Sequence, residues 1–146
     1  MRELPRQLSA EELAGLFEGR TRFVELLAGR DDPLGCALEV IDELSAAEKH
    51  EVLAAHPAIG QKSGLSARSA AEQGTDDDPE VLAELARLNA AYEEQHGFRF
   101  VVFVNRRPKV EILDVLRARI DNPTGEELET ALHELVAIAI DRWQRS

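Results

Sequence analysis

The run Phe98-Arg99-Phe100-Val101-Val102-Phe103-Val104 decides between an all-helical and a mixed fold, because it is the only strongly β-prone stretch of the chain. One isolated strand cannot form a sheet. We therefore expect an extended connector, near 98–104, that is buried between helices. A helical continuation is the alternative, because the pattern of residues 109–120 is clearly helical.

The sequence on both sides of this connector carries the start and stop signals of helices. Capping boxes, in which a Ser or Thr is followed three residues later by Glu, occur at Ser9, at Ser45 and in Thr124-Gly125-Glu126-Glu127. Pro79 suits the first turn of a long helix that ends near Gly97. Further helices are expected at about 21–28, 33–44 and 109–120, and a last helix is expected after the capping box at Thr124. The prediction is an all-α, single-domain helical bundle over 1–146, with one long central helix.

Composition limits the functional classes. With 146 residues, 44% of them hydrophobic, the chain suits one folded domain, and its net charge of −11 disfavours nucleic acids and anionic membranes as partners. The single cysteine, Cys36, cannot form an intrachain disulfide, and no Cys/His array has zinc spacing. No signal peptide, peroxisomal tripeptide or membrane-spanning run is recognisable, so we expect a cytoplasmic protein.

His56 is a candidate catalytic residue because it stands before Pro57 at the predicted end of a helix. The residue before a proline avoids the helical region, so the His56 side chain can project sideways into a cleft. Histidine suits proton transfer near neutral pH. A capping or otherwise structural histidine is the alternative.

Ser69, Glu72 and Gln73 form a second candidate group, since spacings of three and four place them on one helix face. A further capping box, with Ser69 at its start, is the competing interpretation. The short loop after Gly60 would bring this group close to His56.

The connector and the helix after it supply further candidates. The extended segment at 98–102 leaves backbone donors and acceptors that a polar ring could satisfy, although it can equally be a core connector. Arg119 ends the predicted helix after the connector, where it can bind a substrate carboxylate bidentately or serve as a helix-terminal charge.

The order of these motifs resembles the OHCU decarboxylase family, where OHCU is 2-oxo-4-hydroxy-4-carboxy-5-ureidoimidazoline. The similarity covers about Leu13 to Trp143, and the ordered set is specific although each motif alone is weak. The motifs are His56-Pro57-x-Ile59-Gly60, Ser69-x-x-Glu72-Gln73, Leu88-Asn89-x-x-Tyr92, Gly97-Phe98-x-Phe100-Val101 and Arg119-x-x-Asn122.

The resemblance implies an all-helical fold, no cofactor or metal, and conversion of OHCU to (S)-allantoin and carbon dioxide, the third step from urate to allantoin. His56 and Glu72 match the family's catalytic positions. The matching substrate-binding positions are Pro57, Ser69, Gln73, Phe98, Phe100, Val101, Val102 and Arg119. Since relatives are often dimers, a homodimer acting on a small-molecule substrate is expected.

Two positions depart from the family pattern. Ala58 stands where the family often has Asp or Arg, and Arg99 stands where it often has Pro. Arg99 adds a charge near the expected pocket, where it can alter substrate preference or point outward. Two alternatives therefore stay open: a decarboxylase of a related ureido acid, and a helical binding module without catalysis.

Overall fold

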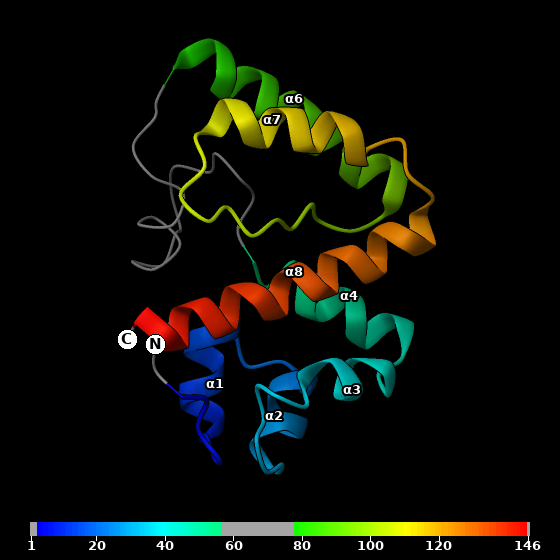
Figure 1. The fold of residues 1–146 in the computed structure, drawn as a ribbon. Coiled ribbons are helices and arrows are strands. Elements are labelled where there is room, and N and C mark those ends of the chain that lie inside the picture. Colours follow the sequence, from blue (N-terminus) through cyan, green and yellow to red (C-terminus); the bar gives the residue numbers. More distant parts are fainter. Residues whose placement is uncertain (1–2, 57–77, 146) are drawn as a thin grey trace. The chain divides into compact units, whose positions relative to one another are not determined.

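The computed structural model describes residues 3–56 and 78–145, and every regular element in these ranges is an α-helix (Figure 1). The all-α class predicted from the sequence is confirmed. The chain divides into two compact units, Met1–His56 with Leu132–Ser146 and Pro57–Ala131. The longest helix in the described ranges, α8 (Thr124–Arg145), contributes its first residues to the second unit and the rest to the first.

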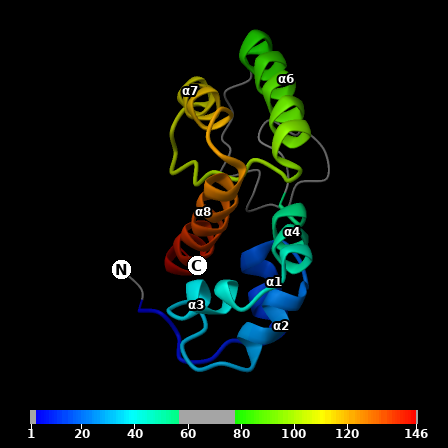
Figure 2. The same cartoon turned by 90° about the vertical axis from the view of Figure 1, so that its right-hand side faces the viewer.

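The first unit is organised around a short central helix, α2 (Arg22–Ala28), which contacts three others (Figure 2). These are α1 (Ala10–Phe17), α3 (Ala37–Asp42) and α4 (Ala46–Ala54). Phe17 and Phe23 meet edge to face, with ring centroids 5.0 Å apart and an interplanar angle of 81°. Both rings are fully buried, so this pair fixes α1 against α2.

Local sequence signals set the starts of α1 and α4. The Ser9 hydroxyl accepts from the Glu12 backbone at 3.1 Å while the Glu12 carboxylate accepts from the Ser9 backbone at 3.0 Å. Ser45 and Glu48 form the same reciprocal pair. These two predicted capping boxes are confirmed. The predicted start of α3 near Pro33 is wrong by one turn, because residues 33–36 form a turn before the helix.

The second unit contains α6 (Pro79–His96) and α7 (Lys109–Arg119), which pack on each other. In Figure 1 these helices run in the same direction, and the segment at 98–104 leads back from the end of α6 toward the start of α7. This segment is non-helical, and five of its seven residues are buried. The predicted connector and the predicted long helix are confirmed, and the helical alternative for 98–104 is wrong.

The predicted capping box at Thr124 is also wrong. Thr124 already lies within α8, and the Glu127 backbone donates to the carbonyl of Pro123 at 3.0 Å. The Thr124 hydroxyl instead contacts His96 Nδ1 at 2.7 Å. Tertiary partners on α6 therefore override the local pattern.

In the described ranges, none of the helices combines the length and the apolar character that a membrane crossing requires.

Candidate functional site

His56 lies just beyond the end of α4, as its place before a proline predicts. Its backbone N–H donates to the carbonyl of Leu53 at 3.2 Å, and its side chain is buried in the first unit. Pro57, Ser69, Glu72 and Gln73 lie outside the described residues. The predicted approach of Glu72 to His56 therefore stays a prediction.

The connector residues named as candidates lie together in the second unit. Phe98, Phe100, Val101 and Val102 are all buried. Tyr92 of α6 packs against both aromatic rings, with centroids 5.9 Å from Phe98 and 5.3 Å from Phe100. These contacts hold the connector backbone in place, so its carbonyl groups keep fixed directions.

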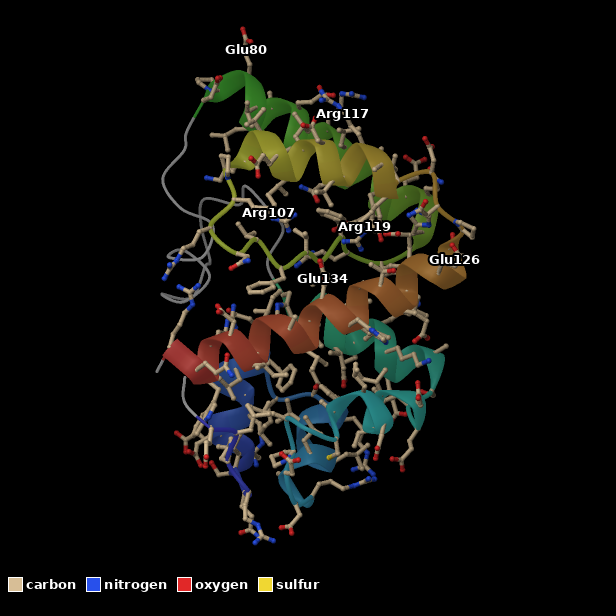
Figure 3. The ribbon with its side chains drawn as sticks, in the orientation of Figure 1. Glu80, Arg107, Arg117, Arg119, Glu126 and Glu134 are labelled. Atoms are coloured by element: carbon tan, nitrogen blue, oxygen red, sulfur yellow. The ribbon has the colours of Figure 1, made fainter. Side chains whose placement is uncertain are left out.

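Arg119, the last residue of α7, points toward this connector (Figure 3). Its Nη1 donates to the carbonyl of Val101 at 2.8 Å, and its guanidinium carbon lies 4.6 Å from the Phe100 ring centroid. The side chain is buried, although arginine is rarely buried without a charge partner. The structure therefore brings together three predicted site residues: Arg119, Phe100 and Val101.

Glu127 is the charge partner of Arg119. The Arg119 Nε donates to Glu127 Oε1 at 2.8 Å, and the Glu127 carboxylate is almost completely buried, with 1% of its side chain exposed. Two further donors complete its surroundings. Tyr92 donates its hydroxyl to Oε1 at 2.6 Å, and Asn122 donates from Nδ2 to Oε2 at 3.0 Å.

The protonation states in this group follow from its contacts. Burial would raise the pKa of Glu127, but hydrogen bonds from Tyr92 and Asn122 and the charge of Arg119 outweigh burial and lower the pKa below its ordinary 4.5. Burial and the bond to Glu127 raise the pKa of the Tyr92 hydroxyl far above its usual range. At neutral pH the group is therefore a carboxylate that accepts from a phenol, an amide and a guanidinium.

Arg99, the charge that departs from the family pattern, has a partner on α6. Its Nε donates to the Glu93 carboxylate at 3.2 Å, and both side chains are about one-third to two-fifths exposed. Its charge is thus offset locally by an acid.

Sequence reasoning missed the role of Glu127, because its spacing from Thr124 fits a capping box. A signal was available in the sequence, because Tyr92 and Asn122 already belonged to the recognised motifs and buried polar side chains need hydrogen-bond partners.

Among the described residues, no cluster of three or more His, Cys, Asp or Glu side chains is suited to holding a metal ion.

Comparison with known proteins agrees with the motif order. The family model described as OHCU decarboxylase matches residues 2–144, nearly the whole chain. The chain belongs to the OHCU decarboxylase family. This family of carboxy-lyases was the one that the five motifs indicated, so that prediction is confirmed.

Two curated relatives illustrate the degree of similarity. An OHCU decarboxylase from Amia calva is 33% identical over 73% of this chain and 65% of its own length. One from Haloferax volcanii is 29% identical over 74% of this chain and 67% of its own length. The chain thus spans about two thirds of these relatives.

The fold is also that of a solved family structure. A crystal structure of OHCU decarboxylase in the presence of (S)-allantoin superposes with a TM-score of 0.75 at 23% identity, covering 90% of this chain and 94% of that one. At this identity the likeness establishes the shared all-helical fold.

Proposed function

We propose that this protein catalyses the decarboxylation of OHCU to (S)-allantoin and carbon dioxide in the breakdown of urate. The observation that carries the proposal is the family match over residues 2–144. The buried Arg119, held against the connector at 2.8 Å from the Val101 carbonyl, supports it because that position was expected to bind substrate.

In the proposed reaction, the bond between the ring carbon and its carboxylate breaks and carbon dioxide leaves. The electron pair of that bond moves into the ring and forms a double bond to the neighbouring ureido-bearing carbon, which gives an enol-like system that neighbouring donors stabilise. A proton then adds to one face of the ureido-bearing carbon and sets the (S) configuration, while the hydroxyl loses its proton and becomes the ring carbonyl. His56 and Glu72 are proposed to control the protonation state of the substrate hydroxyl and of the product.

The proposed binding positions divide into two groups. Arg119 and the connector backbone around Phe98, Phe100, Val101 and Val102 hold the ring and its polar substituents. Pro57, Ser69 and Gln73, which follow His56 in the chain, complete the contacts to the ureido group. No cofactor or metal enters this scheme, because the substrate ring can itself delocalise the charge.

The remaining parts of the proposal concern the assembly and the cell. We propose one domain over residues 1–146, a homodimer and a cytoplasmic location, without nucleic-acid or membrane partners. Light scattering of the purified chain measures the oligomeric state, and fractionation of the source cells measures the location.

The activity is tested by generating OHCU from urate with the two upstream enzymes, adding this protein, and following circular dichroism of the allantoin. The spontaneous reaction gives racemic product, so an optical signal reports the enzyme. His56→Ala should lower turnover by about 100-fold or more. His50→Ala, on the exposed side of α4, is the matched control and should leave turnover unchanged.

Two outcomes would contradict the proposal. A flat optical signal from the folded wild-type protein would exclude OHCU as substrate and favour a related ureido acid or a binding role. Near-normal turnover by folded His56→Ala would remove His56 from the catalytic site.

A further inference from the structure

The Arg119–Glu127 pair in the second unit departs from the usual arrangement of such pairs. Arginine and carboxylate groups frequently form two parallel hydrogen bonds. Here Nε donates to Oε1 at 2.8 Å, whereas Nη2 makes no second bond to Oε2, which accepts from Asn122 Nδ2 at 3.0 Å. The amide of Asn122 therefore helps to set the orientation in which the carboxylate is held relative to the guanidinium.

The consequence falls on Arg119 Nη2. Nε is bonded to Glu127 and Nη1 to the Val101 carbonyl, whereas Nη2 is buried and has no hydrogen-bond partner within residues 3–56 and 78–145. A buried donor without a partner is unfavourable, and it is rare in folded proteins unless a ligand or water completes it. The direction of this donor is set, since the other two nitrogens and the Phe100 ring hold the guanidinium.

The net charge of the Arg119–Glu127 pair indicates which chemical group of a ligand can accept a hydrogen bond from Nη2. Glu127 is ionised and lies 2.8 Å from the guanidinium, so the pair carries no net charge. An N–H donor of a neutral pair suits an uncharged carbonyl oxygen. An uncompensated arginine on the departing carboxylate would stabilise the ground state, which opposes decarboxylation.

We propose that Glu127 and Asn122 are positioning residues, which neutralise and orient Arg119 so that Nη2 binds an uncharged carbonyl oxygen of the ligand rather than its carboxylate. This inference rests on the proposed function, because it assigns a direction and a selectivity to the substrate-binding Arg119. The sequence led us to expect that Arg119 binds the substrate carboxylate through two hydrogen bonds. The inference replaces that contact with one hydrogen bond from Nη2 to an uncharged carbonyl oxygen.

The test uses two ligands that differ in the carboxylate. OHCU carries it, and the product (S)-allantoin lacks it. Asn122→Ala removes the amide that helps to orient the Glu127 carboxylate, so the carboxylate can turn and Oε2 can accept from Nη2. The KM for OHCU should rise about tenfold with kcat changed less than about twofold, and the Kd for (S)-allantoin, measured by calorimetry, should rise by a similar factor.

Gln95→Ala is the matched control. The exposed Gln95 amide donates to the Ile120 carbonyl at 2.8 Å, so this variant also removes an amide hydrogen bond to the turn after α7 but leaves Glu127 untouched. KM and Kd should stay at wild-type values. Equal effects of Gln95→Ala and Asn122→Ala would reduce the role of Asn122 to turn stability and overturn the inference.

A second variant tests the neutralisation. Glu127→Gln keeps an acceptor for Arg119 but removes the negative charge. The Arg119 guanidinium, no longer neutralised, should attract the OHCU carboxylate, so the KM for OHCU should rise less than the Kd for (S)-allantoin. The kcat should fall, because this attraction stabilises bound OHCU more than the transition state. An equal shift of KM and Kd with unchanged kcat would contradict the neutralising role of Glu127.

The remaining outcomes separate this inference from the proposed function. Wild-type protein that neither turns over OHCU nor binds (S)-allantoin would overturn both. Active wild-type protein with an unaffected Asn122→Ala variant would overturn only the positioning role. A raised KM with an unchanged Kd for (S)-allantoin would place Nη2 on the carboxylate and also overturn the inference.

Discussion

Arg142 closes the C-terminal end of α1 by binding Glu18. The Arg142 Nη2 lies 2.9 Å from Glu18 Oε1, with 3% and 10% of the two side chains exposed. Its Nη1 donates to the carbonyl of Leu16 at 3.0 Å. Glu18 adopts a left-handed conformation with φ of 64°, a common way to end a helix. One side chain from the C-terminal part of α8 thus satisfies the end of a helix 126 residues away.

Arg142→Ala should destabilise the protein by about 3–5 kcal/mol, because it removes the guanidinium that neutralises the largely buried Glu18 carboxylate. Urea unfolding followed by circular dichroism measures this change. Arg145→Ala is the control on the same helix, since Arg145 pairs with Asp141 near the surface and should cost below about 1 kcal/mol. Equal losses in the two variants would mean that burial of the Arg142 pair adds nothing.

The protein should become less stable as the pH falls, because Glu127 loses its negative charge when it is protonated. Its folded pKa lies below the ordinary 4.5, so its contribution is present above about pH 4.5 and is lost as pH falls through the folded pKa. Glu127→Gln should therefore flatten the stability profile below pH 4.5. The measurement is urea unfolding between pH 3.5 and 7. Parallel profiles for wild type and variant would remove Glu127 as a source of acid sensitivity.

Gly97 and Gly15 should respond in opposite directions to alanine. Gly97 ends α6 with φ of 79°, a conformation that costs an alanine about 1 kcal/mol. Gly15 lies within α1 with open space at its Cβ position, so alanine there should stabilise the helix by about 0.5–1 kcal/mol. Thermal unfolding of both variants tests the signs. A stabilising Gly97→Ala would contradict the left-handed cap.

Arg119→Lys should lower kcat/KM for OHCU by roughly 10- to 100-fold. A lysine has one ammonium group and cannot contact Glu127, the Val101 carbonyl and a ligand in the same fixed directions. The optical assay with OHCU measures the loss. Arg117→Lys, an exposed change on the same helix, should leave the rate unchanged. Wild-type kcat/KM in folded Arg119→Lys would show that charge alone suffices.

Much of the helical framework could be predicted because its signals are local. The capping boxes at Ser9 and Ser45 need only residues three apart, and the isolated β-prone run at 98–104 could form no sheet. The motif order from His56 to Asn122 was likewise enough to predict the family.

The tertiary structure alone decided how the Thr124–Glu127 pattern is used. It has the same spacing as the two confirmed capping boxes, yet Tyr92, 35 residues earlier in the chain, donates to the Glu127 carboxylate. The physical reason is burial: a carboxylate withdrawn from water needs the strongest donors within reach, and packing brought Tyr92 and Arg119 there. The sequence by itself determined which helices form and which family they build. Packing decided that Glu127 holds Arg119, and that one buried guanidinium nitrogen has no hydrogen-bond partner within the described part of the chain.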